Sequence, residues 1–189
     1  MAAVRVVFLE APEQLLAERR RLGLDGRDEM WEGELHMVPP PSFGHQERAA
    51  ALASSLLPRA RSLGLRLATE PGLYASDDSW RVPELAVVRP QQVVHRGVEG
   101  GAVLVVEIRS PGDETSAKIP FYAAFGVEEL LVVDRDTAAV ELLRLAGGAL
   151  HAVPADNAGW VTCSLDVGFR QAPANVLEVH LPDAAIQHC

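Results

Sequence analysis

Apolar runs separated by one short helical segment dominate the middle of the chain. Val82–Val88 and Ala102–Ile108 are almost continuously apolar, a pattern typical of strands that are buried on both faces. A third run, Leu130–Asp134, follows residues 117–125, whose apolar positions predict a helix that ends at Gly126. The order strand, helix, strand predicts a parallel crossover, so we expect all three runs to lie in one sheet.

The part of the chain before these runs contains a second helix with an apolar face. Leu52, Leu56 and Leu63 lie within residues 42–64 and recur at helical spacing, so they are expected to pack on the sheet. Pro58 is expected to kink or break this helix, because proline has no backbone N–H to donate. The pattern therefore predicts a helical layer against one face of the sheet.

Residues Met30–Val38 are interpreted as one extended segment that three prolines bring to an end. Glu32, Glu34 and His36 alternate along it and would share one face of a strand. That face is either an exposed polar surface or the wall of a cleft into which one of these side chains points.

Weaker patterns complete the prediction. Pro120 is compatible with the central helix only in its first turn, and the chain from Pro154 onward is expected to be less regular. The other predicted elements are strands at residues 4–9, 65–69 and 72–75, a helix at residues 12–23, and a hairpin of residues 140–145 and 150–153. No repeat or linker divides residues 1–189, so we expect one α/β domain with a mixed central sheet flanked by helices.

Composition narrows the class of protein. The net charge of −9 argues against broad electrostatic attraction to nucleic acid, although it allows a local basic patch. The chain has neither the pattern of a signal peptide nor an apolar run as long as a membrane span, so we expect a cytoplasmic protein that does not contact a membrane. Cys163 and Cys189 lack metal-binding or disulfide spacing, and two reduced thiols are expected.

Two carboxylates and one ammonium stand out among the apolar runs. Glu84 and Glu107 interrupt the first two runs, and Lys118, the only lysine among 17 basic residues, lies on the predicted central helix. Burying an unpaired carboxylate is costly. The acids could hold a divalent metal against a phosphate while the ammonium offsets charge or activates a water. The alternative is a structural pair between Glu107 and an arginine at the end of the strand.

Longer motifs extend this picture. They are EGEL at Glu32–Leu35, PPPSFGHQ at Pro39–Gln46, VPELAVV at Val82–Val88, VVEIRSPGDETSAK at Val105–Lys118 and FYAAFGVEELLVVD at Phe121–Asp134. Over residues 13–179 the chain therefore resembles the Uma2 family, a branch of the PD-(D/E)xK nuclease-like superfamily. The resemblance implies a restriction-endonuclease-like core, with a mixed four- or five-stranded sheet flanked by helices.

The resemblance also implies roles for individual residues. Glu84 stands where the family has Asp, and Lys118 serves in place of the lysine that the motif would put at Arg109. Glu84 is one methylene longer than Asp, and Pro120 closely follows Lys118, so both departures bear on whether such a site is active. The implied catalytic residues are Glu84, Glu107, Lys118, Glu34 and His45; Gln46, Arg81 and Arg109 are expected to bind substrate; Glu84, Glu107 and the carbonyl of Ile108 are expected to hold Mg²⁺ or Mn²⁺.

Two functions follow from these residues and the resemblance. The first is a Mg²⁺-dependent endonuclease that hydrolyses phosphodiester bonds of DNA, with a homodimer as the form that cuts both strands. The second is a catalytically silent nuclease fold that serves as a nucleic-acid-binding or protein-assembly module. The acidic net charge and the replacement of Asp by Glu84 favour the second function. The combination of Glu84, Glu107, Lys118 and Glu34 favours the first.

Overall fold

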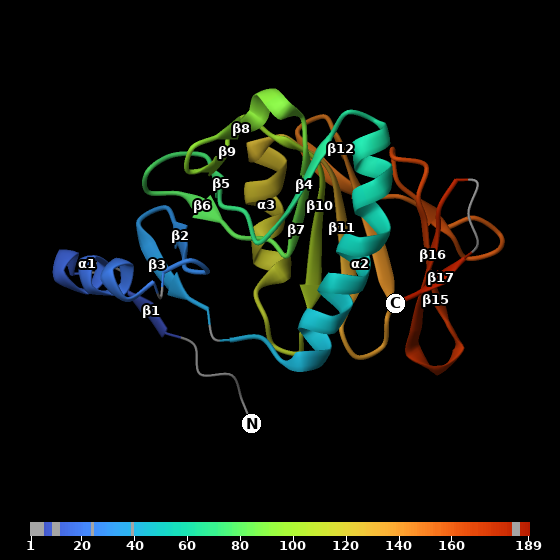
Figure 1. The fold of residues 1–189 in the computed structure, drawn as a ribbon, viewed down its shortest axis with the longest axis horizontal. Coiled ribbons are helices and arrows are strands. Elements are labelled where there is room, and N and C mark those ends of the chain that lie inside the picture. The colour runs from blue at the N-terminus through green and yellow to red at the C-terminus, as the bar shows by residue number, and fades with distance from the viewer. Residues whose placement is uncertain (1–5, 9–11, 24, 39, 183–185) are drawn as a thin grey trace.

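The computed structural model describes residues 6–8, 12–23, 25–38, 40–182 and 186–189. At its centre is a mixed six-stranded sheet with the order β13-β12-β11-β10-β7-β4 (Figure 1). Neighbouring strands are antiparallel except β10 and β11, which are parallel and are joined by α3 (Thr115–Phe125). The three apolar runs therefore lie in one sheet, as predicted. The strands are β4 (Arg66–Thr69), β7 (Leu85–Val88), β10 (Ala102–Arg109), β11 (Val127–Asp134), β12 (Val140–Ala146) and β13 (Ala149–Ala152).

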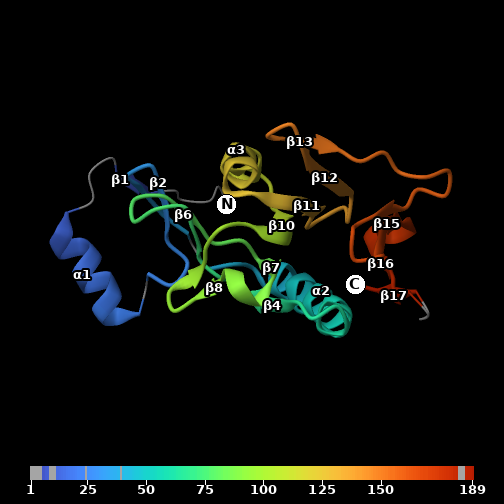
Figure 2. The same ribbon diagram turned by 90° about the horizontal axis from the view of Figure 1, so that it is seen from above.

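Burial explains why the apolar runs occupy the middle of the sheet. Every residue of β7 is buried, as is all of β10 except its last residue. Leu52 and Leu56 of α2 (Phe43–Ser62) pack on one face of the sheet, whereas Tyr122 and Phe125 of α3 pack on the other. Figure 2 shows the two helices on opposite sides of the sheet. The predicted α/β class with helices flanking a mixed sheet is confirmed.

The two long helices differ in detail from their sequence predictions. Leu63 is 44% exposed because α2 ends at Ser62, and Ala60 is the residue that packs in the core. The helix continues through Pro58 without a break, so the packing of this face outweighs a proline cost of about 3 kcal/mol. Pro120 lies in the second turn of α3 rather than in the first. Among the described residues, no helix is long and apolar enough to span a membrane.

A seven-stranded sheet of short strands lies beside the central sheet, with α1 (Glu13–Leu22) next to it. The helix ends at Gly23, as predicted, in the left-handed conformation. Of the strand predicted for residues 4–9, residues 6–8 form β1, and residues 4, 5 and 9 lie outside the described residues. In spatial order the strands are β1 (Val6–Phe8), β3 (Glu34–Met37), β2 (Glu29–Trp31), β6 (Trp80–Arg81), β5 (Leu73–Tyr74), β9 (Gly97–Val98) and β8 (Val93–Val94).

A hairpin of β2 and β3 replaces the single extended segment that the sequence suggested. The turn residues Glu32 and Gly33 have φ angles of 49° and 92°. Two successive positive φ angles form the tight turn whose twist matches the flanking strands. Glu34 and His36 share a face of β3, as predicted, but Glu32 lies in the turn.

The C-terminal part of the chain is more regular than predicted. It forms a four-stranded antiparallel sheet whose buried Phe169, Leu177 and Val179 join the core on the α2 side. Short strands with alternating buried positions give a weak sequence pattern, and the prolines and glycines between them obscure it. The strands are β14 (Val161–Thr162), β15 (Gly168–Ala172), β16 (Val176–His180) and β17 (Gln187–His188).

Candidate active site

The carboxyl end of β10 and the N-terminal ends of α2 and α3 lie together at one end of the strands of the central sheet (Figure 1). The antiparallel register pairs Val106 of β10 with Leu85 of β7, so the next residues outward, Glu107 and Glu84, lie side by side. Oε2 of Glu84 accepts a 3.0 Å hydrogen bond from the backbone N–H of Ile108. Each of the two carboxyl groups also shifts the pKa of the other. The structure thus brings together the two acids that the sequence singled out.

Lys118 carries a positive charge from α3 to this pair. Its Nζ lies 3.1 Å from Oε1 of Glu107 and 2.8 Å from Oε1 of Glu29. Tyr122 follows one helical turn later on the same face, and its hydroxyl donates a short hydrogen bond to Glu107. Pro120, between them, does not displace the ammonium. The cationic partner of Glu107 is therefore this lysine, and not an arginine at the end of the strand.

Glu29, rather than the predicted Glu34, is the acid of the hairpin that contacts Lys118 and lines the cavity. The hairpin register places Glu29 opposite His36 and Glu34 opposite Trp31, so both acids share a face but Glu34 lies at the turn end. Glu29 is 2% exposed and accepts a 2.9 Å hydrogen bond from the Val82 N–H. Glu34 is not among the described residues that line the cavity at this site. The turn signal at Glu32–Gly33 could have revealed this register.

His45 holds Glu84 from the first turn of α2. Ser42 caps that helix, and its hydroxyl accepts a 3.3 Å hydrogen bond from the N–H of His45. The ring Nε2 lies 2.8 Å from Oε1 of Glu84, and the ring Nδ1 lies 3.5 Å from Oγ of Ser110. Because Ile108 binds the other carboxylate oxygen, the orientation of Glu84 is fixed at both of its oxygens.

Burial and charge shift the pKa values of the cluster in different directions. Burial by itself would raise the pKa of Glu84, but hydrogen bonds with His45 and Glu107 and the nearby ammonium lower it to about 2. Burial raises the pKa of Glu107 well above its ordinary value, and the neighbouring carboxylates add to the rise against the opposing ammonium charge. Glu84 is therefore the stronger acid of the two. Burial would lower the pKa of Lys118, but the surrounding carboxylates raise it, so the side chain stays charged.

A cavity of about 540 Å³ opens onto this cluster. His36 lines it and stacks on Trp31 with ring centroids 4.1 Å apart, while its Nδ1 lies 3.0 Å from Oε2 of Glu114. The other ring nitrogen, Nε2, is buried and has no hydrogen-bond partner among the described residues. Such an atom can be satisfied by a molecule that enters the cavity. Other polar residues on the wall include Arg27, Glu29, His45, Glu84, Glu107, Ser110, Asp113, Lys118 and Arg135.

Arg81 does not reach this cavity, which corrects its assignment to substrate binding. Its guanidinium lies 4.3 Å from the ring centroids of both Trp31 and Phe121, and the side chain is 3% exposed. It donates a 2.7 Å hydrogen bond to the carbonyl of Met30. Burial lowers the pKa of Arg81, and the two rings stabilise its charge. Arg81 therefore ties the hairpin to α3 and is enclosed by both.

Gln46 and Arg109 lie near the site but not on its wall. Nε2 of Gln46 donates a 3.2 Å hydrogen bond to Glu70, and Nε of Arg109 lies 3.6 Å from Oδ2 of Asp134. Neither is among the described residues that line the cavity. Both side chains reach solvent, so their contact with a substrate stays a prediction.

The oxygen donors at this site fit a divalent metal that has few protein ligands. Within the described ranges, no group of three or more His, Cys, Asp and Glu side chains is arranged to hold a metal ion. Mg²⁺ at phosphate-processing sites is usually held by one or two carboxylates, substrate oxygens and water. Glu84 and Glu107 are two carboxylates on the wall of the cavity, the number that such a site needs. The N–H and C=O of a strand residue point to the same side, so the carbonyl of Ile108 is expected on the side of β10 where its N–H meets Glu84.

Comparison with known proteins identifies both a family and a fold. The family model Uma2, described as "Putative restriction endonuclease", matches residues 12–182. Among solved structures, the chain is similar to one titled "Crystal structure of a putative nuclease belonging to DUF820 from Anabaena variabilis ATCC 29413 at 1.96 A resolution". The two chains are 18% identical with a TM-score of 0.55, over 74% of this chain and 83% of the other, a likeness that shows the fold. No curated protein matches the chain.

Proposed function

The chain belongs to the Uma2 family, and on that premise we propose that it is an endonuclease that uses Mg²⁺ or Mn²⁺ to hydrolyse phosphodiester bonds of DNA. The observation that carries the proposal is the Lys118 ammonium held between Glu29 and Glu107 at the wall of an open cavity. Glu84 also lies near Lys118, so three nearly buried carboxyl groups surround this one ammonium. Such an excess of negative charge is costly unless the cavity receives a cation.

Glu84, Glu107 and the carbonyl of Ile108 are the groups that would hold the metal. When bound, Mg²⁺ or Mn²⁺ would supply a Lewis acid against an oxygen of the scissile phosphate. His45 and the N–H of Ile108 orient one carboxylate, and Tyr122 orients the other. The chain therefore fixes both acids before a substrate arrives, which lowers the reorganisation needed during the reaction.

Lys118 is assigned to charge stabilisation rather than to deprotonation of the attacking water. Its raised pKa keeps it an ammonium, and an ammonium has no lone pair with which to accept a proton. As the water oxygen bonds to phosphorus and the ester oxygen leaves, negative charge grows on the phosphate oxygens. The ammonium offsets that charge. His36, whose Nε2 has no hydrogen-bond partner among the described residues, lies on the same wall and is placed to contact the substrate.

A plasmid-nicking assay tests this function. Supercoiled DNA is incubated with Mg²⁺ or Mn²⁺ and the wild type, Glu107→Gln or Glu129→Gln, the last being a buried carboxylate that does not line the cavity. We expect Glu107→Gln to slow cleavage at least about 100-fold, as loss of one transition-state contact does. Glu129→Gln should cleave as the wild type does. Cleavage that survives Glu107→Gln would place the active site elsewhere.

The silent module remains the second candidate, because one observation favours it. Lys118 already satisfies Glu29 and Glu107 internally, so the cluster can serve as a buried ion-pair network in a fold that only binds. Titration calorimetry with Mg²⁺ and Mn²⁺ separates the two candidates. A wild type that neither binds these ions nor nicks plasmid would favour the silent module. Metal binding that Glu107→Gln abolishes and Glu129→Gln retains would favour the nuclease.

Two copies of such a site are needed to cut both strands of a duplex, so we expect the nuclease to act as a homodimer. Sedimentation with and without DNA measures this directly, and a monomer in both conditions would limit the protein to nicking.

A further inference from the structure

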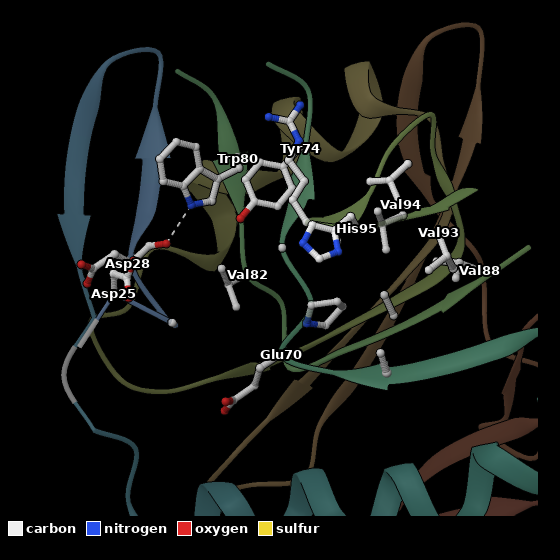
Figure 3. A pocket seen from close by; sticks show the side chains of 18 of the residues that line it. Asp25, Asp28, Glu70, Tyr74, Trp80, Val82, Val88, Val93, Val94 and His95 are labelled. Carbon is white, nitrogen blue, oxygen red and sulfur yellow. Dashed lines mark hydrogen bonds between the residues drawn. The ribbon is translucent and has the colours of Figure 1, made fainter. Parts of the chain in front are cut away.

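A second and larger cavity of about 720 Å³ lies between the central sheet, the short-stranded sheet and α1. Figure 3 shows side chains that line it. Its size is within the range of small-molecule binding sites, which is roughly 300–1,000 Å³. The acidic residues Glu84 and Glu107 do not line it. It therefore requires an explanation separate from the acidic cluster.

The lining of this cavity combines flat, apolar and polar surfaces. Tyr74 and Trp80 form an aromatic wall, with ring centroids 5.6 Å apart, above an apolar surface that includes Val82 and Val88. In Figure 3 these side chains and His95 project toward the same space. Bases stack on aromatic rings of this kind whatever their sequence.

Several polar groups on the wall have no partner in the part of the chain that the structure describes. The Tyr74 hydroxyl, the His95 ring nitrogens and the Arg66 guanidinium make no hydrogen bond or ion pair with any described residue. They come from three different strands or turns, yet all face one cavity. An apolar cavity with a few unpartnered polar groups is the usual form of a site that orients a ligand.

The two cavities share a wall. Arg27 lines the acidic cavity, Glu70 lines the second one, and their side chains form an ion pair of 3.1 Å. Successive residues also face alternate sides, since Asp28 lines the second cavity and Glu29 the acidic one. In addition, the N–H of Glu70 donates a 3.0 Å hydrogen bond to the carbonyl of Glu84. A nucleotide next to a phosphate in the acidic cavity is therefore close to the second cavity.

We propose that the second cavity receives an unpaired nucleobase of the strand that is bound at the acidic cluster. The inference rests on the proposed nuclease function and adds a site that contacts a base. The base stacks on Trp80, because the Arg96 guanidinium already lies 4.7 Å from the centroid of the Tyr74 ring, and its polar edge meets the Tyr74 hydroxyl and His95. Arg66, on the rim, meets the phosphate of the same nucleotide. Extruding a base into such a pocket also makes cleavage sensitive to how easily the strand unpairs.

The test compares two tryptophan variants at neighbouring residues of β4. One places its side chain in the cavity, and the other, on the opposite face of the strand, is the control. Ala68 of β4 lines the cavity, whereas Thr69 points to the opposite face of the same strand and lines neither cavity. Ala68→Trp therefore blocks the cavity, and Thr69→Trp adds the same side chain elsewhere. His95→Ala is a milder second variant, because His95 is exposed and unpartnered among the described residues.

Binding is measured by fluorescence anisotropy in metal-free buffer of low ionic strength. The probes are a short single-stranded oligonucleotide of mixed sequence and an abasic strand of equal length. We expect the wild type and Thr69→Trp to bind the oligonucleotide about tenfold more tightly than the abasic strand, the effect of one stacked base. Ala68→Trp and His95→Ala should reduce or abolish that difference.

Equal affinity of the wild type for the two strands would overturn the inference, as would equal behaviour of Ala68→Trp and Thr69→Trp. Plasmid nicking by the same preparations keeps the two proposals separate. Base-dependent binding that Ala68→Trp removes, in a wild type that does not nick, supports the base site and rejects the nuclease. Nicking by a wild type that does not distinguish the strands retains the nuclease and rejects the base site.

Discussion

Two buried glutamates on the parallel strands β10 and β11 have similar burial but different partners. The side chain of Glu107 is 3% exposed and that of Glu129 is 2% exposed. Glu129 lies 2.7 Å from the guanidinium of Arg144 and accepts a 2.7 Å hydrogen bond from the N–H of Ser164, so each oxygen has its own partner. Glu107 instead shares the ammonium of Lys118 with Glu29 and lies beside Glu84. Burial alone therefore does not mark a functional carboxylate.

What distinguishes the two positions is how charge is balanced and where the strand ends. Glu129 lies near the start of β11, and its partner Arg144 is 51% exposed, so water also solvates the pair. Glu107 lies near the carboxyl end of β10, where the N-termini of α2 and α3 lie close together and a cavity opens. Carboxyl ends of strands are where open α/β sheets usually bind ligands. A buried acid at that end whose cation is shared with other carboxylates indicates a binding site.

Removal of the cation at each position should give the largest difference. Lys118→Met leaves two buried carboxylates without their ammonium, and we expect a loss of about 3–5 kcal/mol of unfolding free energy. Arg144→Met leaves Glu129 with the Ser164 N–H and with water, so a loss of about 1 kcal/mol is expected. Urea unfolding at neutral pH measures both. Equal losses would mean that the two carboxylates are equally dependent on their cations.

Neutralising each carboxylate should give changes of opposite sign. Glu129→Gln weakens a satisfied pair and should lower the unfolding free energy by about 1–3 kcal/mol. Glu107→Gln removes repulsion from Glu84 and Glu29, so the metal-free protein should keep or gain stability. Thermal unfolding in the presence of a chelator compares the two variants. A clear loss of stability in Glu107→Gln would show that its ion pair with Lys118 outweighs the repulsion.

The pH dependence of stability should separate the same two variants. Because the pKa of Glu107 is raised in the folded state, its stabilising proton is bound at low pH and is lost as pH rises through that pKa. Glu84, with a pKa lowered to about 2, has the opposite effect, and its contribution is lost as pH falls below about 4.5. Above pH ~5 the wild type should therefore lose stability as pH rises, by at most about 1.4 kcal/mol per pH unit.

Urea unfolding at several pH values in metal-free buffer measures that slope. Glu107→Gln should remove it, whereas Glu129→Gln should keep it. A slope that persists in Glu107→Gln would assign the titration to another group.

Loss of the hydroxyl that orients Glu107 should have a smaller effect. Tyr122→Phe keeps the ring in the core and removes one hydrogen bond, worth about 1 kcal/mol or roughly fivefold in nicking rate. Matched rates of plasmid nicking by Tyr122→Phe and the wild type would show that Lys118 alone positions the carboxylate.

Glu34→Ala should have the smallest effect, because this acid does not line the acidic cavity. We expect a stability change within about 0.5 kcal/mol and unchanged nicking, as for other surface substitutions. Glu29→Ala, at the position that pairs with Lys118, should be the more damaging of the two in both assays. The reverse order would return the catalytic assignment to Glu34.

The sequence by itself determined the central sheet, its two helices and most of the acidic cluster. Hydrophobic periodicity is local, so it predicted the strand-helix-strand unit from Ala102 to Asp134 without any knowledge of partners. Glu84, Glu107 and Lys118 were identifiable because a charged residue in or beside an apolar run is costly unless it is used. His45 and the family itself were indicated by the longer motifs.

Only the tertiary structure decided which groups complete the cluster. Glu29 meets Lys118 because of a hairpin register, and Tyr122 meets Glu107 because α3 packs over β10. The same packing encloses Arg81 between two rings and excludes it from the cavity. Such contacts join residues far apart in the chain, and their geometry depends on how whole elements pack. The sequence pattern indicates which charged residues are buried, but the tertiary structure determines which partner compensates each buried charge.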